Sequence, residues 1–517
     1  MLSAIAWTRG QPALRREIEA ALREAPAWLG EGALRSTCRL PRGPWLVKRF
    51  RAGAGAVERV KAAVGRAPAD REWDALAALH AAGLPVPEPL ALGALADGDR
   101  LLAMEWVEGK LLLDALPADR AARRTLLRAL GELVARVHGA GWVHGDLHAG
   151  NVLIAAQGPV LLDWQRARRT RARAARRRDL AFLEYSLARV TSRSDRFRVR
   201  QAKLAVSPPL GDDARHELRA AGDAVDRRAD EHARSRTRRA LREDRLHARV
   251  EIGERRGMRL RELAPETVAA LLDQHEQALR AGDARLLESD ARSALSAVSA
   301  DGRCAVVKEA RWRGVGRALA DALRGSAGRR AWLAGHGLLA RRLGAPRPLA
   351  FLERRRWGAP IASWVVLEDL RPAVPAAFAV ERGEAPAEAV LSALARLVID
   401  LHRARVDHGD LKATNVLLLR GSAGRLETAL VDLEGVRFPR RLSEARRIAA
   451  LAELNASLPD AYPADARRRA FERYALALPF ARGRSRALDE VVAASLARRH
   501  RWTGCGPSAP RQVDRLE

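Results

Sequence analysis

One short polar pattern occurs twice in this chain of 517 residues, and it limits the possible folds more than any other feature. An Asp is followed by an Asn five positions later, and a second Asp comes after a later apolar run. An aspartate base, with an amide and a carboxylate that can hold Mg²⁺, is the set of groups that phosphoryl transfer requires. The catalytic candidates are Asp146 and Asp410, and the candidate metal ligands are Asn151, Asp163, Asn415 and Asp432.

Both copies of the pattern lie inside a longer internal repeat. Trp73 stands 14 residues before Pro87, and Trp332 stands 14 residues before Pro346. The five residues that begin at each proline align without a gap. Two unrelated segments would not keep this order and spacing, so the chain contains two copies of one structural unit.

The length and the repeat together predict two domains. The fold class that we expect is α+β, with two tandem bilobal protein-kinase-like domains, each with a small β-rich N-lobe and a larger helical C-lobe. The charged stretch 205–250 contains few large apolar residues and is the predicted junction between domains 1–230 and 231–517. Apolar periodicity predicts strands within 34–50, 101–106, 286–308 and 364–368, and helices over 68–82 and 119–140.

Lysine is rare in this sequence, so each lysine needs a reason. Only six of the 92 basic residues are Lys, while Arg is common everywhere. Lys48 and Lys308 each end an apolar, strand-like run, and a compact ammonium there suits nucleotide phosphates differently from a planar guanidinium. Lys412 follows Asp410 by two positions and is a further candidate for the transferred phosphate. The first unit has His148 at that place.

Carboxylates are expected to orient the two lysines and to mark the nucleotide site. Glu72, on the helix 68–82, is the predicted partner of Lys48. The ungapped alignment puts Ala331 at the corresponding position of the second unit, so Glu368 or Asp321 would have to serve Lys308.

The predicted strands 101–106 and 364–368 lead into hinges where a nucleotide base would bind. Their glutamates, Glu105 and Glu368, are therefore cofactor-binding candidates. The nearest thing to a glycine-rich phosphate loop is Gly30-Glu31-Gly32, which is a weak match. We expect His144 to hold the catalytic loop by hydrogen bonds rather than to do chemistry.

The net charge of +29 allows a polyanionic partner such as nucleic acid, anionic lipid or a phosphorylated saccharide. A biased Ala- and Arg-rich composition explains the charge equally well. The tract 166–178 holds eight Arg, and it is either a solvated helical face or a phosphate-binding platform beside the cleft. Aromatic residues are only 4% of the chain, and no nucleic-acid-binding signature is visible, so specific nucleic-acid binding is disfavoured.

The remaining sequence features point to the cytoplasm. The three cysteines are far apart and odd in number, which predicts neither a disulfide framework nor a metal site. We also read no signal peptide and no apolar run long enough for a transmembrane span.

The second unit resembles the lipopolysaccharide kinase family, whose members phosphorylate 3-deoxy-D-manno-octulosonic acid (Kdo) or core heptose. The likeness lies in residues 408–415 and 431–438, in the helix around Arg330-Ala331-Trp332, and in 454–458. The first unit is similar in residues 70–73. Its loop 144–151 looks equally like those of aminoglycoside and choline-type small-molecule kinases.

The resemblance implies ATP and Mg²⁺ as cofactors and a saccharide or lipopolysaccharide acceptor. It also implies a cytoplasmic protein in peripheral contact with the anionic face of the inner membrane. Two alternatives stay open from the residues: a kinase of another small molecule or protein hydroxyl, and a pseudokinase pair that binds ATP without turnover. Gly145 and Gly409 replace the Arg of the His-Arg-Asp loop, so control by a phosphorylated activation loop is not expected.

Overall fold

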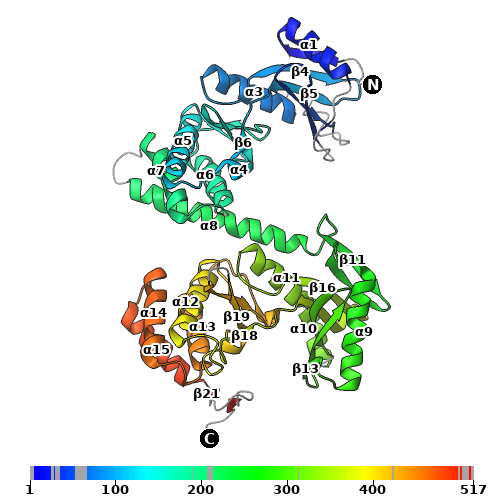
Figure 1. Ribbon diagram of the computed structural model, residues 1–517, viewed down its shortest axis with the longest axis vertical. Coiled ribbons are helices and arrows are strands. Elements are labelled where there is room, and N and C mark those ends of the chain that lie inside the picture. The colour runs from blue at the N-terminus through cyan, green and yellow to red at the C-terminus, as the bar shows by residue number, and fades with distance from the viewer. Residues whose placement is uncertain are drawn as a thin grey trace. The chain divides into compact units, whose positions relative to one another are not determined.

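The computed structural model describes residues 5–24, 28, 35–52, 67–188, 190–206, 213–311, 314–421, 424–498, 501–502 and 512–513. The chain divides into two compact units, Met1–Ala229 and Asp230–Glu517, whose elements are labelled in Figure 1. The boundary falls inside helix α8 (Asp213–Arg239). We call them unit 1 and unit 2.

Unit 1 begins with a five-stranded antiparallel sheet in the order β1-β4-β5-β3-β2. Successive side chains of a strand face opposite ways. Leu101 and Ala103 therefore join the core formed with α1, while Leu102 and Met104 join the core formed with α3. The elements are β1 (Ile5–Gly10), α1 (Pro12–Arg23), β2 (Arg35–Arg39), β3 (Trp45–Phe50), α3 (Pro68–Ala81), β4 (Pro89–Leu95) and β5 (Arg100–Glu105).

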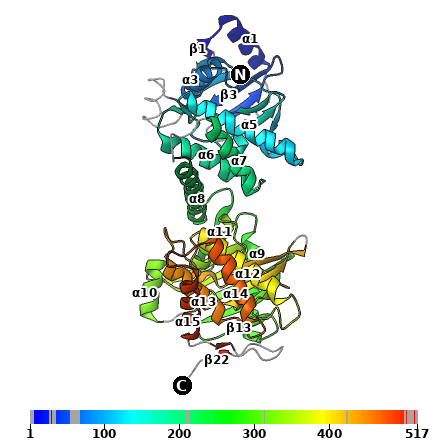
Figure 2. The ribbon, with the colours of Figure 1, turned by 90° about the vertical axis from the view of Figure 1, so that its left-hand side faces the viewer.

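The rest of unit 1 is mainly helical, and α5 packs along α7 (Figure 2). Beside these helices, a small sheet, β6-β8-β9, carries the first copy of the polar pattern. The elements are β6 (Lys110–Leu111), α4 (Leu112–Ala115), α5 (Arg120–Gly139), β7 (Trp142–Val143), η1 (Ala149–Asn151), β8 (Val152–Ala155), β9 (Gly158–Leu161), β10 (Arg168–Arg169), α6 (Arg173–Leu187) and α7 (Arg193–Val206).

Unit 2 repeats this plan with a seven-stranded sheet in the order β11-β12-β16-β17-β15-β14-β13. Helix α11 packs on the sheet, and Trp332 of this helix is fully buried. The elements are β11 (His247–Ile252), β12 (Arg255–Leu260), α9 (Pro265–Ala281), β13 (Leu286–Ser289), β14 (Ser293–Ala300), β15 (Arg303–Ala310), α10 (Val315–Arg324), α11 (Ala327–Ala340), β16 (Pro348–Arg356) and β17 (Ala359–Glu368).

The helical part of unit 2 packs α12 along α14 and α13 along α15 (Figure 2). The small sheet β18-β19-β20 carries the second copy of the pattern. The elements are β18 (Val374–Pro375), α12 (Ala387–Arg403), η2 (Ala413–Asn415), β19 (Val416–Arg420), β20 (Leu426–Leu430), η4 (Leu433–Gly435), α13 (Glu444–Ala456), α14 (Ala464–Ala477), α15 (Arg484–Leu496), β21 (Arg501–Trp502) and β22 (Gln512–Val513).

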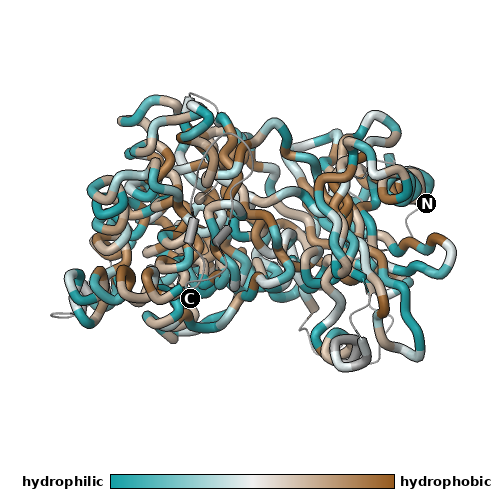
Figure 3. The backbone as a smooth tube through the Cα atoms, turned by 90° about the horizontal axis from the view of Figure 1, so that it is seen from below, coloured by the Kyte–Doolittle hydropathy of each residue, from teal (hydrophilic) through white to brown (hydrophobic). Residues whose placement is uncertain are grey.

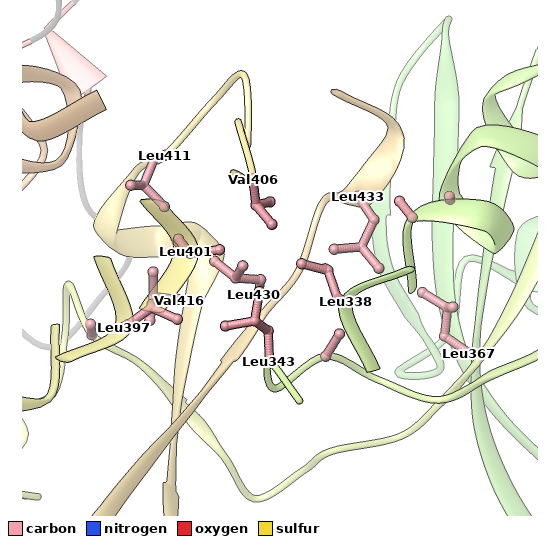
Figure 4. Close-up of a cluster of buried hydrophobic side chains, with 14 of the residues drawn as sticks. Leu338, Leu343, Leu367, Leu397, Leu401, Val406, Leu411, Val416, Leu430 and Leu433 are labelled. Atoms are coloured by element: carbon pink, nitrogen blue, oxygen red, sulfur yellow. The ribbon is translucent and has the colours of Figure 1, made fainter. Parts of the chain in front are cut away.

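One apolar core joins the sheet and the helical part within unit 2. Figure 4 shows Leu338 of α11 and Leu430 of β20 pointing toward one another, with Leu401 of α12 close by. Along the helices, hydrophilic residues alternate with hydrophobic ones (Figure 3), as expected for helices that bury one face.

The predicted α+β class, helices and strands are confirmed, but several further strands were not predicted, among them β1, β4 and β16. Strands β11 and β12 were not predicted, because their sequence alternates Arg and Glu with small apolar residues and reads as a charged stretch. In the part of the chain that the structure describes, no helix combines the length and hydropathy that crossing a bilayer would need.

Candidate functional site

A buried ion pair ties the sheet of unit 1 to its covering helix. Lys48 of β3 places its Nζ 2.5 Å from Glu72 Oε1 on α3 and 3.3 Å from Asp163 Oδ1. The side chains of Lys48 and Glu72 are 8% and 0% exposed. Glu72 Oε1 also accepts from the Trp164 backbone N–H at 3.2 Å. The predicted pairing of Lys48 with Glu72 is present, and it reaches the segment that carries Asp163.

The histidine of each loop has a structural role, as the sequence predicts for His144. His144 Nε2 lies 2.8 Å from the Leu162 carbonyl oxygen, and its Nδ1 accepts from the Asp146 N–H at 3.3 Å. Burial lowers the pKa of His144, so the neutral ring donates from Nε2. His408 Nε2 makes the same contact, 3.1 Å from Val431 O. Both rings fasten the loop before Asp146 or Asp410 to the strand before the second Asp.

The amide of each pattern is oriented by the loop itself. Asn151 Nδ2 donates to Asp146 O at 3.0 Å, and Asn415 Nδ2 donates to Asp410 O at 2.9 Å. Because the NH₂ group is occupied, the amide oxygen is the atom left for a cation.

The second Asp of each pattern has an unusual backbone. Asp163 has φ +67° and Asp432 has φ +57°, in the left-handed region that few residues other than glycine adopt. Backbone strain of this kind persists where the surroundings fix it and is concentrated at functional sites. Its occurrence at the same place in both units supports a functional reading.

The glycine before Asp146 is required by space and by backbone angle. Gly145 has φ +77°, and a Cβ there would lie 2.4 Å from Arg166 O. We expect Gly145→Ala to lower the free energy of unfolding of unit 1 by at least about 1–2 kcal/mol, the cost of the left-handed conformation alone. Gly139→Ala, where a Cβ meets nothing within 4 Å, is the matched control. Equal hydrogen-exchange protection of unit 1 in the two variants would contradict this.

Lys308 of unit 2 has a different partner from those predicted. Its Nζ lies 2.9 Å from Glu434 Oε1 and also contacts Asp432. The candidates Glu368 and Asp321 are wrong for this role, because Glu368 accepts from the Arg347 N–H and Asp321 pairs with Arg330. The η4 turn after Asp432 brings Glu434 back to Lys308. The helix position that corresponds to Glu72 is Ala331, which has no carboxylate to pair with the lysine.

These charges affect one another strongly. Burial would raise the pKa of Asp432, but the hydrogen bond from Glu434 and the charge of Lys308 lower it to about 2. Burial and the neighbouring Asp432 raise the pKa of Glu434. Burial opposes the charged form of Lys308, yet the two carboxylates hold its pKa above the usual range. The cluster therefore stays ionised at Lys308 and Asp432.

A cleft of about 890 Å³ in unit 2 is lined by all the predicted site residues of that unit except Lys412. This volume is within the range of small-ligand sites. Val306, Leu367 and Leu417 give it apolar walls. Lys412 is not among the lining residues, but its Nζ is 3.0 Å from Asp410 Oδ1. The polar residues of the lining include Lys308, Glu368, Asp410, Asn415, Asp432 and Glu434.

The two hinge glutamates are held in the same way. Glu105 Oε2 accepts from the Glu88 N–H at 3.2 Å, and Glu368 Oε2 accepts from the Arg347 N–H at 3.2 Å. Each carboxylate therefore fixes the end of its strand to the preceding proline-rich turn. Their part in binding a nucleotide stays a prediction.

In unit 1 the acidic groups are paired with two arginines: Arg35, which was not predicted, and Arg166, the first residue of the Arg tract. Arg35 of β2 lies 2.7 Å from Asp163, and Arg166 lies 3.5 Å from Asp146. Burial would raise the pKa of Asp163, but Lys48 and Arg35 lower it. Strand register could have found Arg35, which lies opposite Phe50, two residues past Lys48. Unit 2 has Ser293 at that place.

Two anchors of the loops that carry Asp146 and Asp410 were also missed. Asp179 of α6, 5% exposed, accepts from the His144 and Gly145 N–H groups at 2.6 and 2.9 Å. Ser186 Oγ accepts from Ala149 N, and Ser457 Oγ accepts from Ala413 N in unit 2, both at 2.8 Å. Asp179 directly follows the Arg tract, and in such a charged stretch the sequence does not indicate that this acid is buried.

Some predicted features remain unassigned. Within the tract 166–178, Arg166 approaches Asp146 and Arg169 lies over the Trp142 ring, while a phosphate-binding role stays a prediction. Gly30-Glu31-Gly32 and Cys505 lie outside the described residues. No group of three or more His, Cys, Asp or Glu side chains gathers as a metal site in the described ranges, and an amide–carboxylate pair would not register as one.

Comparison with known proteins finds similarity to 3-deoxy-D-manno-octulosonic acid kinases. The 3-deoxy-D-manno-octulosonic acid kinase of Stenotrophomonas maltophilia is 39% identical over 127 residues, which cover 23% of this chain and 49% of the relative. That of Xanthomonas axonopodis pv. citri is 36% identical over 137 residues, covering 26% and 55%. The chain thus spans about half the length of the curated relatives it matches.

Two solved structures show distant similarity, and a family match covers most of the chain. WaaP in complex with acyl carrier protein is 22% identical, covering 43% of this chain and 90% of that one, with a TM-score of 0.32. The kinase-methyltransferase WbdD is 18% identical, covering 38% and 51%, with a TM-score of 0.27. The family match covers residues 51–202 and 290–474. Since these two regions exceed half of its length, the chain belongs to the Lipopolysaccharide kinase (Kdo/WaaP) family.

Proposed function

We propose that the chain is an ATP- and Mg²⁺-dependent phosphotransferase that phosphorylates a sugar hydroxyl of the lipopolysaccharide core, on Kdo or heptose. The observation that carries this proposal is the unit 2 cleft, which gathers Lys308, Asp410, Asn415 and Asp432 around one space. The family and the names of the relatives support the acceptor class.

The proposed roles follow from the chemistry of each side chain. Asp410 orients the acceptor hydroxyl and receives its proton, and Lys308 neutralises nucleotide phosphates. Lys412, beside Asp410, reaches toward the transferred phosphate. The Asn415 amide oxygen and the Asp432 carboxylate are the hard oxygen ligands that suit Mg²⁺. When bound, that ion supplies charge neutralisation at the phosphates.

The proposed architecture is a tandem pair of bilobal kinase-like domains, residues 1–230 and 231–517. In each unit an antiparallel sheet with a covering helix precedes a small sheet and a helical part. Each unit also places Lys, Asp, Asn and Asp in the same chain order. This correspondence supports a shared ancestral unit, with the nucleotide between the sheet and the helical part.

For unit 1 we propose ATP binding with slower turnover than in unit 2. Asp163 is already paired with Arg35 and Lys48, and Arg166 stands beside Asp146. A cation at Asp163 would have to share the carboxylate with a guanidinium. Unit 1 would then regulate unit 2 or act on a smaller acceptor, as in the aminoglycoside- and choline-type kinases that its loop resembles.

The direct test is phosphate transfer from labelled ATP to purified core saccharide. Mass spectrometry of lipopolysaccharide from a deletion strain should show a missing phosphate. Binding of ATP without transfer to any core saccharide would favour the pseudokinase alternative.

The proposed acceptor also implies a cytoplasmic protein that works at the inner-membrane face.

Glu434→Gln tests the assignment of the Lys308 partner. We expect the KM for ATP to rise about tenfold with a smaller change in kcat, because Lys308 loses a charge-assisted contact but keeps Asp432. Glu384→Gln, which removes a half-exposed carboxylate paired with Arg420, is the control. An unchanged KM in the Glu434 variant would remove Glu434 from the site.

A further inference from the structure

The hairpin between β16 and β17 ends in an exposed basic and aromatic tip. Arg354, Arg355, Arg356, Trp357 and Gly358 are all exposed, and the Trp357 side chain is 92% exposed. The Arg356 guanidinium stacks 4.5 Å from the centre of the Trp357 ring. An indole combines an apolar ring with one polar N–H, so it favours surfaces that are part apolar and part wet.

The charge of this tip is not cancelled locally. Glu353 pairs with Arg355 at 2.7 Å, while the neighbouring strand β12 places Arg255 opposite Arg354. Arg354 and Arg356 have no carboxylate within ion-pair distance among the described residues. The tip therefore presents two uncompensated guanidinium groups beside the indole.

The hairpin extends beyond strand β15 at the edge of the cleft, and on its other side the pairing of β16 with β12 ends at Arg354. The pairing of β15 with β17 ends at Ala310 opposite Ser363, and β17 extends four residues further, to Ala359. Four residues of strand span about 13 Å. Pro360 and Ile361, within this extension, line the cleft that contains Asp410. A surface bound at the tip would thus lie next to the cleft opening.

We propose that the tip Arg354–Gly358 docks unit 2 onto an anionic lipid bilayer. Arginines near an anionic surface are attracted to its headgroups, and the indole enters the headgroup layer. The arrangement brings the cleft to lipid-linked acceptors, but docking does not depend on phosphate transfer. A bilayer fits better than a nucleic acid, because a single indole with two free arginines at a projecting tip makes no extended groove for a strand.

The test is flotation of the full chain with vesicles of phosphatidylcholine alone or mixed with phosphatidylglycerol. We expect binding only to the mixed vesicles, weakened by salt. Each of Arg354→Gln and Arg356→Gln should lower the partition coefficient about fivefold. Trp357→Ala should lower it about tenfold. All three side chains are exposed, so unchanged thermal unfolding checks that folding is intact.

Matched controls separate local docking from net charge. Arg484→Gln removes the same single charge from an exposed position of α15, and Leu476→Ala removes a side chain that is 74% exposed on α14. We expect these variants to bind like the wild type. An equal loss in the control and tip variants overturns the proposal, as does equal wild-type binding to neutral vesicles. Tighter binding to single-stranded nucleic acid that needs the same residues would also overturn it.

Discussion

Asp410→Asn should lower the rate of phosphate transfer about 10²–10⁴-fold, the usual contribution of a positioned general base. Asparagine keeps the size of the side chain and one of its two acceptor oxygens, so the cleft should still bind ATP. The loss should therefore fall on kcat rather than on nucleotide affinity. Steady-state transfer to core saccharide and separate ATP-binding titrations measure the two effects.

The corresponding change in unit 1, Asp146→Asn, measures how much of the phosphate transfer each unit performs. We expect Asp146→Asn to lower transfer much less than Asp410→Asn, because Arg35 of unit 1 already pairs with Asp163, whereas unit 2 has Ser293 at that place. Asp489→Asn, on an exposed face of α15, is the control for the loss of a carboxylate. Undiminished ATP turnover in the double variant Asp146→Asn with Asp410→Asn would reject both assigned bases.

Glu72→Gln should destabilise unit 1 by about 3 kcal/mol, the lower end of the cost of removing one partner of a buried ion pair. The amide cannot balance the Lys48 charge, which keeps only Asp163 at 3.3 Å. Hydrogen exchange followed by mass spectrometry can measure this for α3 and β3 separately from unit 2. Protection there should fall while unit 2 peptides stay unchanged.

A neighbouring acid on the same helix provides the control for that experiment. Asp74 of α3 pairs with Arg9, but these side chains are 52% and 39% exposed. Surface pairs of this kind contribute about 0–1 kcal/mol, so Asp74→Asn should have little effect. The double variant Lys48→Met with Glu72→Leu should recover part of the loss, since an apolar pair needs no charge balance. Equal effects of the Glu72 and Asp74 changes would contradict a buried pair.

The sequence was sufficient to predict contacts between residues that belong to a recognisable motif or to the internal repeat. The pairing of Lys48 with Glu72 follows from a strand, a helix and the internal repeat, and the contact is present. The role of His144 follows from its place beside Asp146. These residues are close to a recognisable pattern, so their neighbours could be anticipated before the fold was known.

The rest depended on geometry that one sequence does not contain. Glu434 reaches Lys308 only because a turn folds the chain back after Asp432, so a search along the helix pointed to the wrong carboxylates. Arg35 reaches Asp163 because of its register opposite Phe50. Asp179 faces inward from a helix that begins in an Arg-rich tract.

The loop anchors have a consequence for exchanging parts between the two units. The serines Ser186 and Ser457 occupy equivalent places, but counting back seven residues gives Asp179 in unit 1 and Ala450 in unit 2. Unit 2 instead holds its loop with Glu453, which accepts from the Leu411 N–H at 3.0 Å. Each loop is thus matched to its own helix. A chimera that transplants one loop without α6 or α13 should leave backbone donors without acceptors, so the interchangeable module is the loop together with its helix.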